Sequence, residues 1–463
     1  MKHLKIFNTH NNYNNFILDE NNTPNVSICN MEEHVHYNKK IECLQRYLTF
    51  TALEPGTFTV TINCNTDNLN YLEYSLDNGN SWNRTDNIDG SAVIITTPTL
   101  QTGERVMWRG SGYRMCNIGS GQTPSAFSST GRFNASGSIM SLLYVDNFDK
   151  ETTEAAAFKA LFKNCTTLVT PPELPATSIN ENSYNEMFKG CTSLTIAPDI
   201  PATSVAYAGC QAMFAGCSSM TTTPSELKAL NPLANAYYFM FENCTSITDM
   251  PKIMATEFKN NVCYGMLKGC TSLTKVYKLY VPRILENSCR EMFMNCTSLM
   301  NVPSDMISSV IKIDGSGCNA MFSGCSKLET SPEINATTLA YGSLYGMFKN
   351  CTSLTSTPSE LPATSLASAC YREMFMGCTS ITEAPILPAT TLISQCYQQM
   401  FDGCTLLTKI KMMATDVSAS YCLSNWVRNV ASDGIFIKNI DAAWTTTGSS
   451  GIPSGWTVQT AAS

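Results

Sequence analysis

Residues 201–217 read PATSVAYAGCQAMFAGC, and the end of this stretch, Met213 to Cys217, recurs from residue 161 almost to the end of the chain. The cysteine that closes the motif falls at ten positions, 26 to 29 residues apart: Cys165, Cys191, Cys217, Cys244, Cys270, Cys296, Cys325, Cys351, Cys378 and Cys404. A divergent eleventh copy, Trp426 to Val430, follows one period later. Regular repeats of this length with an atypical last unit predict a stacked solenoid with a terminal cap.

Each unit has the apolar spacing of a short helix. Cys210, Met213, Phe214 and Cys217 stand at i, i+3, i+4 and i+7. The residue before every motif cysteine is Gly or Asn, and both tolerate the left-handed conformation that ends helices. A short extended segment closed by proline follows, as in residues 354–358. The sequence therefore predicts an α/β solenoid of about eleven 26-residue units over residues 151–435, with parallel strands on one side and helices on the other.

The cysteines are predicted to be reduced and buried, because cysteine is a small apolar residue that suits a crowded column inside a stack. The clearest members of the motif column are Cys191, Cys217, Cys270, Cys296, Cys351, Cys378 and Cys404. A second column is predicted at Cys210, Cys263, Cys289, Cys318, Cys370, Cys396 and Cys422, exchanged elsewhere for Tyr184, Tyr237 or Leu344. The repeats contain neither Cys-x-x-Cys pairs nor histidine, so we expect no metal and no cofactor there.

The motif, with the Leu/Ile-Pro-Ala-Thr that follows it at 174–177, 200–203, 361–364 and 387–390, resembles the BspA-like leucine-rich repeats of bacterial surface antigens. The resemblance covers about residues 150–435. It implies a right-handed solenoid used for adhesion or protein binding. Those antigens are exported, whereas this chain opens without the apolar core of a secretory signal, and its repeat is longer and richer in proline.

Residues 46–115 predict a small antiparallel β-sandwich, from alternating segments at 47–51, 57–62, 92–95 and 105–108. Within it, residues 75–82 resemble the Asp-box of sialidases and other propellers, in which Asp77 and Gly79 shape a hairpin and Trp82 packs beneath it. A propeller enzyme would carry several such boxes, and this chain has one. Residues 116–150 are interpreted as a β-rich connector and N-terminal cap, and residues 436–463 as a C-terminal cap.

The composition and charge of the chain argue against several classes of function. The net charge is −7 and only 14% of residues are charged, so neither nucleic acid nor an anionic membrane attracts the chain. No run of about 18 apolar residues predicts a membrane span. A carbohydrate-active enzyme would need paired carboxylates, and the sandwich offers candidates by residue type only: Glu54, Glu73, Asp77 and Asp86. We expect no catalytic residues and no enzymatic activity.

All four histidines lie in the first 36 residues. His34 and His36 could share one face of a strand and bind a transition metal around a symmetry axis, although a solvated strand is the simpler interpretation. Residues 1–45 are interpreted as a virion-anchor segment, because their sequence resembles the N-terminal segment of structural proteins of Bacteroides-infecting, crAss-like phages. The tail around Trp456 is similar to that of repeat proteins in the same group.

These resemblances imply a phage structural protein, a head or tail fibre or decoration protein that is made in the host cytoplasm and released in virions by lysis. The expected partners are capsid or tail proteins through the N-terminal segment, a second and third copy of the chain as a dimer or trimer, and a glycan or protein of the host surface or gut mucosa. Tyr264, Tyr371 and Tyr397 are candidate contact residues, or they pack between units. The alternative is a bacterial cell-surface BspA-like adhesin.

Overall fold

The computed structural model describes residues 46–65, 67–85, 88, 92–116 and 123–461. Residues 47–463 form one compact unit. The predicted anchor, residues 1–45, lies outside the described residues, and so do His34 and His36.

The N-terminal part of this unit is built from two sheets. The larger sheet has the order β4-β3-β6-β1-β8-β9 and the smaller has the order β5-β2-β7. Their strands are β1 (Leu48–Ala52), β2 (Phe58–Ile62), β3 (Leu69–Ser75), β4 (Asn83–Thr85), β5 (Val93–Thr96), β6 (Arg105–Gly112), β7 (Ala126–Ser129), β8 (Phe133–Ser136) and β9 (Leu168–Thr170). Strands β1, β2, β5 and β6 lie where the sequence predicts strands.

The two sheets pack against each other through aromatic side chains. The ring of Phe50 on β1 lies 5.6 Å from that of Phe58 on β2 and 5.0 Å from that of Phe127 on β7, centroid to centroid. Because β7 and β8 pair with β2 and β1, the sheets extend to Ser136. The boundary predicted at residue 115 is therefore too early: it leaves out two strands that complete the sheets.

The connector holds one short helix, α2 (Ser141–Tyr144), and then leads into the repeats. The first repeat contributes β9, which pairs in parallel with β8, so the larger sheet continues into the solenoid without a break. The buried residues of both parts form one hydrophobic core.

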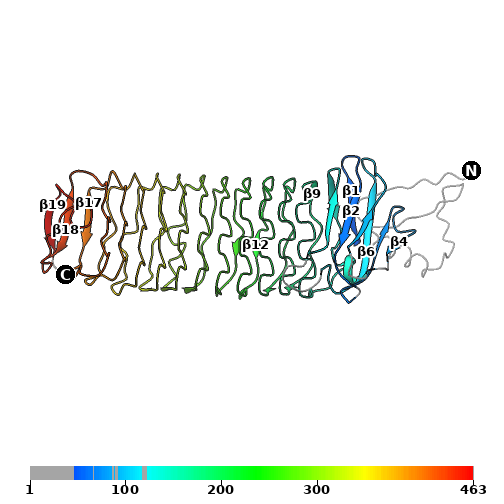
Figure 1. Ribbon diagram of the computed structural model, residues 1–463, viewed down its shortest axis with the longest axis horizontal. Helices are drawn as coiled ribbons and strands as arrows, with labels where there is room; N and C mark the ends of the chain where they lie inside the picture. The colour runs from blue at the N-terminus through cyan, green and yellow to red at the C-terminus, as the bar shows by residue number, and fades with distance from the viewer. Residues whose placement is uncertain (1–45, 66, 86–87, 89–91, 117–122, 462–463) are drawn as a thin grey trace, which may run out of the picture. The chain divides into compact units, whose positions relative to one another are not determined.

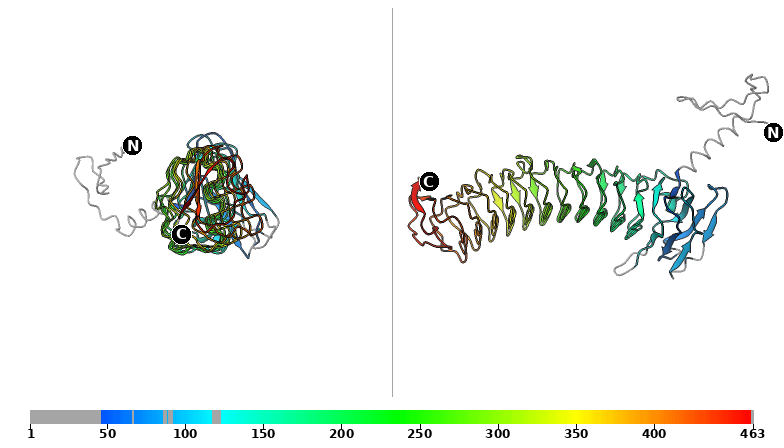
Figure 2. Two further views of the ribbon diagram at one scale, coloured as in Figure 1. Left: turned by 90° about the vertical axis from the view of Figure 1, so that its left-hand side faces the viewer. Right: turned by 90° about the horizontal axis from the view of Figure 1, so that it is seen from above.

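The repeats stack turn upon turn along the chain (Figure 1). Seen end-on, the turns superpose in a three-sided outline (Figure 2, left). The strands of the stack are short and parallel: β10 (Ser178–Ile179), β11 (Ser204–Val205), β12 (Glu226–Leu227), β13 (Lys252–Ile253), β14 (Arg283–Ile284), β15 (Lys312–Ile313) and β16 (Thr338–Leu339), followed by β17 (Lys409–Met412), β18 (Ile435–Asn439) and β19 (Thr457–Ala461).

The predicted helices are wrong. Each segment that ends at a motif cysteine is a chain of turns, and these segments, all within the described residues, contain no α-helix. A residue with positive φ stands at every fourth position, as at Ala208, Ala212 and Gly216, and this triplet recurs eleven times. Left-handed residues at that interval prevent the continuous right-handed backbone that an α-helix requires. The solenoid is therefore built of turns and short strands.

Hydrogen bonds between turns of the solenoid take the place of helical ones. In the first motif segment, Phe162 N–H donates to Met187 O of the next turn at 2.8 Å, and Cys165 N–H donates back to Phe162 O at 2.9 Å. The same alternation recurs along the stack. A left-handed residue other than glycine costs about 1–2 kcal/mol, which these ladder bonds offset by pairing the buried backbone groups. The i, i+3, i+4, i+7 spacing fits both structures, since both point the same side chains inward.

The interior is a column of stacked aromatic rings. Phe162, Phe188, Phe214 and Phe241 lie on one another with centroids 5.3 to 5.5 Å apart and planes within 7° of parallel. Leu267 interrupts the column, which resumes from Phe293 to Phe401. At its N-terminal end Phe162 stacks on Phe127 of β7, 5.6 Å away, so the column joins the core of the two sheets.

The C-terminal end of the column is covered by tryptophans. Trp426 and Trp456 are buried, and Trp444 packs partly buried against the same core. Each indole N–H donates to a backbone carbonyl: Trp426 to Gly451, Trp444 to Ala414 and Trp456 to Ala431, at 2.8 to 2.9 Å. Large rings with satisfied N–H groups suit the end of a stack that has no further turn to cover it.

The strain at left-handed residues other than glycine leads to a testable prediction about stability. Ala320 has a φ of 53° at a place where other turns have Gly265 and Gly346. Ala320→Gly should stabilise the chain by roughly 0.5–1 kcal/mol, because relief of the left-handed strain exceeds the entropy that glycine adds to the unfolded state. Chemical denaturation measures the change. The matched control is Ala215→Gly in the same kind of segment but without positive φ; it should destabilise the chain, and a loss in both variants would contradict the prediction.

Candidate binding surface

The motif cysteines are buried, and no disulfide forms among the described residues. Nine of them donate a hydrogen bond from Sγ to a carbonyl of the preceding turn, as Cys191 does to Phe162 O at 3.0 Å. The other eight bonds, made by Cys217, Cys244, Cys270, Cys296, Cys325, Cys351, Cys378 and Cys404, are 3.0 to 3.2 Å long. Phe162 O thus accepts both this thiol and the N–H of Cys165. Cysteine serves here as a small buried donor.

The second column corrects two of the predicted contact residues. Tyr371 and Tyr397 are fully buried and stack on each other with ring centroids 5.9 Å apart, so the prediction that they reach a ligand is wrong. Both stand seven residues before their motif cysteine, as Tyr184 does before Cys191 and Leu344 before Cys351, and this is the column position. The ladder bonds from Leu344 N–H to Cys370 O and from Tyr371 N–H to Cys396 O show this register. The tyrosines therefore occupy the column, and Cys370, Cys396 and Cys422 lie one residue before it.

The Asp-box residues hold the hairpin between β3 and β4. Asp77 accepts hydrogen bonds from Ser81 N–H at 2.9 Å and from the hydroxyls of Ser81 and Ser75 at 2.6 and 2.8 Å, and these bonds lower its pKa to about 2. Gly79 has a φ of 80° in the turn. The guanidinium carbon of Arg109 lies over the ring of Trp82, 4.0 Å from the ring centroid. This geometry stabilises a turn.

The other carboxylates named as enzyme candidates are also engaged. Glu73 is paired with Arg109 at 2.6 Å and Arg84 at 3.8 Å, and Glu54 is 3.9 Å from Arg132. Asp86 lies outside the described residues. Nowhere in the described part of the chain do three or more His, Cys, Asp or Glu side chains gather so that they could hold a metal ion. Nor does a helix among the described residues have the length and apolar character to cross a membrane.

Tyr264, the third predicted contact residue, lies at the surface in a cluster of aromatic side chains. We call Tyr238, Phe239 and Tyr264 the aromatic patch. The three ring centroids are 4.6 to 5.1 Å apart, and every one of the three side chains is partly exposed. The patch spans two neighbouring turns on the side of the solenoid formed by the motif segments. Sequence reasoning missed Tyr238 and Phe239, although most other turns have small, polar or charged residues at these two positions.

The backbone at Phe239 has an unusual conformation, and the next turn leaves room for its ring. This residue has a φ of 51°, a left-handed conformation that bulky side chains rarely adopt. In the next turn a Cβ at Gly265 would lie 2.1 Å from the Phe239 ring, so only glycine leaves room for it. Strained residues that the surroundings hold in place tend to gather at functional sites.

Charged groups surround the patch. Arg290 lies over the Tyr264 ring at 5.2 Å, and Lys268 is 5.6 Å from the Phe239 centroid. The carboxylate of Glu291 is paired with Lys268 Nζ at 2.8 Å and with Arg290 Nε at 3.4 Å. It also accepts a hydrogen bond from the Tyr264 hydroxyl at 3.3 Å. Burial alone would raise the pKa of Glu291, but the bonds and charges of Lys268 and Arg290 hold it below its ordinary value. The carboxylate is thus ionised at neutral pH.

The same charged network occurs a second time without the aromatic cluster. The carboxylate of Glu373 is paired with Lys349 Nζ at 2.8 Å and with Arg372 Nε at 3.3 Å. It accepts a hydrogen bond from the Tyr345 hydroxyl at 3.0 Å. In the turn before Tyr345, the place of Phe239 is taken by Ala320. The network is therefore a recurring structural feature of the solenoid, and the additional aromatic rings distinguish the patch from it.

No family model matches this chain, and no curated protein does. The chain is similar to several solved structures, two of which are crystal structures of bacterial leucine-rich proteins. One is a leucine-rich cell-surface protein of Faecalibacterium prausnitzii, with 16% identity over 65% of this chain and 88% of that one and a TM-score of 0.27. The other is a leucine-rich-repeat protein of Eubacterium ventriosum, with 12% identity over 65% and 84% and a TM-score of 0.24.

Proposed function

We propose that this protein is an attachment protein whose solenoid binds a glycan or protein of a host surface or the gut mucosa. The observation that carries the proposal is the aromatic patch. Tyrosine and arginine are the residues that most often dominate binding energy at interfaces, and a stack of turns gives such residues a rigid, extended support. The half-buried rings of Tyr238, Phe239 and Tyr264, with Arg290 over one of them, have this composition.

The carrier that we propose is a phage virion, in which the chain is a head or tail fibre or a decoration protein. The resemblance of the N-terminal segment to phage structural proteins supports this, and residues 1–45 would dock to capsid or tail proteins. Self-association as a dimer or trimer would present several solenoids together, and multivalency strengthens weak contacts. A bacterial cell-surface adhesin is the alternative carrier. Immunogold labelling of purified particles and of whole cells with an antibody against the solenoid separates the two.

The attachment role is tested by removing the patch from the full-length chain. Tyr238→Ala combined with Tyr264→Ala should lower retention on fixed Bacteroides cells or on immobilised intestinal mucin about 30-fold, which corresponds to about 2 kcal/mol for aromatic hot spots. Binding curves of the labelled protein on both supports give the change in affinity.

Tyr345→Ala is the matched control, because Tyr345 belongs to the same kind of charged network but has no aromatic cluster beside it. Circular dichroism verifies that each variant is folded. Retention that is equal in the patch variant and the control, or wild-type protein that is retained on neither support, would contradict the proposed function.

A further inference from the structure

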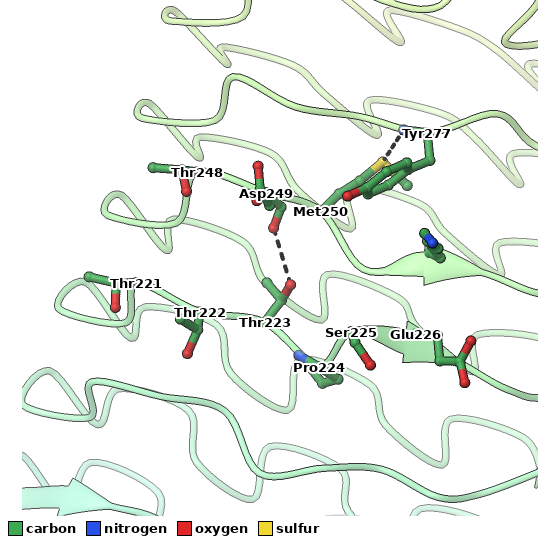
Figure 3. A pocket seen from close by; sticks show the side chains of 11 residues that line it. Thr221, Thr222, Thr223, Pro224, Ser225, Glu226, Thr248, Asp249, Met250 and Tyr277 are labelled. Carbon is green, nitrogen blue, oxygen red and sulfur yellow. Dashed lines mark hydrogen bonds between the residues drawn. The ribbon is translucent and has the colours of Figure 1, made fainter.

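A groove lies on another side of the solenoid, apart from the aromatic patch. It consists of two adjoining depressions of about 550 Å³ each, which share Glu226, Lys252 and Tyr277. The first also includes residues 221–225 and 248–250, and the second extends to Tyr280 and Asp305. Figure 3 shows the first depression, with the Thr221–Glu226 segment of one turn below Thr248, Asp249 and Met250 of the next.

The groove lies where the repeat is irregular. In four turns a strand begins 13 residues after the motif cysteine, as Ser204 does after Cys191. β12 begins nine residues after Cys217 and β13 eight residues after Cys244. These two strands pair with each other and form a two-stranded sheet of their own. Irregular units of a solenoid often form its binding face.

Tyrosine rings stand along the groove. Tyr277 is half-buried, and its backbone N–H donates to the sulfur of the buried Met250 at 3.4 Å, so the ring lies beside an apolar support (Figure 3). Tyr280 is 62% exposed. The ammonium groups of Lys252 and Lys275 lie 5.7 and 5.3 Å from the Tyr277 centroid, and that of Lys278 lies 5.8 Å from the Tyr280 centroid. Partly exposed aromatic rings suit the C–H faces of sugar rings, which are apolar.

The polar groups of the groove are hydroxyls, carboxylates and ammonium groups in near balance. Three lining residues carry a carboxylate, Glu226, Asp249 and Asp305, and two carry an ammonium group, Lys252 and Lys278. Lys278 is paired with Asp305 at 2.8 Å and Glu226 with Lys228 at 3.7 Å. The charges of the groove are therefore largely compensated, and they do not select a strongly charged ligand. A neutral ligand rich in hydroxyl groups can donate to the carboxylates and accept from Lys252.

We infer that this groove binds a linear neutral oligosaccharide, with sugar faces on Tyr277 and Tyr280 and sugar hydroxyls on Glu226, Asp249 and Lys252. The two depressions together cross four turns, a distance on the order of 14 Å at the spacing of paired strands, which holds a short oligosaccharide but not a globular partner. The inference rests on the proposed attachment function, since it names a ligand class for the attaching solenoid. It uses a site separate from the aromatic patch.

The test is calorimetric titration of the full-length chain with four probes: cellotetraose, mannotetraose, N-acetylchitotetraose and the acidic tetragalacturonate. At least one neutral probe should bind, and Tyr277→Ala should weaken that binding about tenfold or more. Tyr280→Ala should weaken it as well, and because its side chain is mostly exposed this variant preserves the fold. The control is Tyr341→Ala, which removes a tyrosine that is 64% exposed on the motif side and should leave the affinity unchanged.

Three outcomes would overturn the inference: no neutral probe binds at concentrations of about 10 mM, tetragalacturonate binds more tightly than every neutral probe, or Tyr277→Ala and Tyr280→Ala leave the affinity as it is. Failure here is distinguishable from failure of the attachment function. If retention on cells or mucin still depends on Tyr238 and Tyr264, the attachment function stands while the groove is excluded as its oligosaccharide site.

Discussion

Phe322→Ala should destabilise the folded chain by about 3–5 kcal/mol, the range for truncating a fully buried phenylalanine. Phe322 is completely buried between Phe293 and Phe348, with ring centroids at 5.3 and 5.6 Å. Truncation removes both stacking contacts and leaves a cavity that neighbouring turns cannot fill, because their ladder bonds fix the distance between them. Guanidinium denaturation followed by circular dichroism measures the loss.

Phe322→Leu is the matched control, because Leu267 occupies the same column in another turn and is equally buried. Its cost should be on the order of 1–1.5 kcal/mol, since leucine fills much of the volume and loses mainly the stacking. Equal losses for the alanine and leucine variants, or a loss below about 1 kcal/mol for alanine, would contradict a close-packed column.

Alkaline pH should unfold the protein abruptly. Burial raises the thiol pKa of the nine motif cysteines from Cys191 to Cys404, to about 12 for Cys217, Cys325 and Cys378. Each of these thiols also donates to a carbonyl oxygen, which a thiolate would repel. The stability that the protonated thiols provide is therefore fully present below the unfolded pKa near 9 and is lost as pH rises toward the folded values.

The size of this effect follows from the number of thiols. Each one lowers the free energy of unfolding by about 1.4 kcal/mol per pH unit above the unfolded pKa, so nine lower it by about 12 kcal/mol per unit. That is as large as the whole stability of a typical domain. Denaturation curves at pH 8 to 11 under reducing conditions should show the transition between about pH 9 and 10, where the thiols of the unfolded chain ionise before most of its tyrosines.

A triple variant tests whether the thiols cause the transition. Replacing Cys244, Cys270 and Cys296 by alanine should make the dependence on pH shallower by about 4 kcal/mol per unit, even though the variant is less stable at neutral pH. A free energy of unfolding that stays constant from pH 9 to 10, or an unchanged slope in the triple variant, would show that the thiols do not govern alkaline stability.

The sequence alone determined the period, the number of units and which residues form the column of motif cysteines. The motif cysteines and the Met-Phe pair before them had to be buried, because only a stacked interior repeats small and large apolar residues at so constant an interval. The left-handed conformation before each motif cysteine was predictable too, since Gly and Asn adopt it readily.

The sequence could not decide whether the segments that end at the motif cysteines form helices or turns. Ala212, Glu291 and Gln399 are ordinary helix formers, yet all three have positive φ. Their conformation is set by carbonyl groups of the next turn, which accept their N–H groups, and a hydrogen-bond partner 25 to 28 residues away leaves no local signal. The apolar spacing is the same in both structures.

The binding surfaces depended on the tertiary structure for a similar reason. Tyr371 and Tyr397 stand seven residues before their motif cysteines and are buried, whereas Tyr264 stands six residues before Cys270 and lies at the surface. Only the stacking of turns places Phe239 of the preceding turn beside Tyr264. The groove at Tyr277 is lined by Glu226 of β12 and Lys252 of β13, which the pairing of two neighbouring turns brings together. Contacts between turns decide which side chain is buried and which is presented, and those contacts form only when the turns stack.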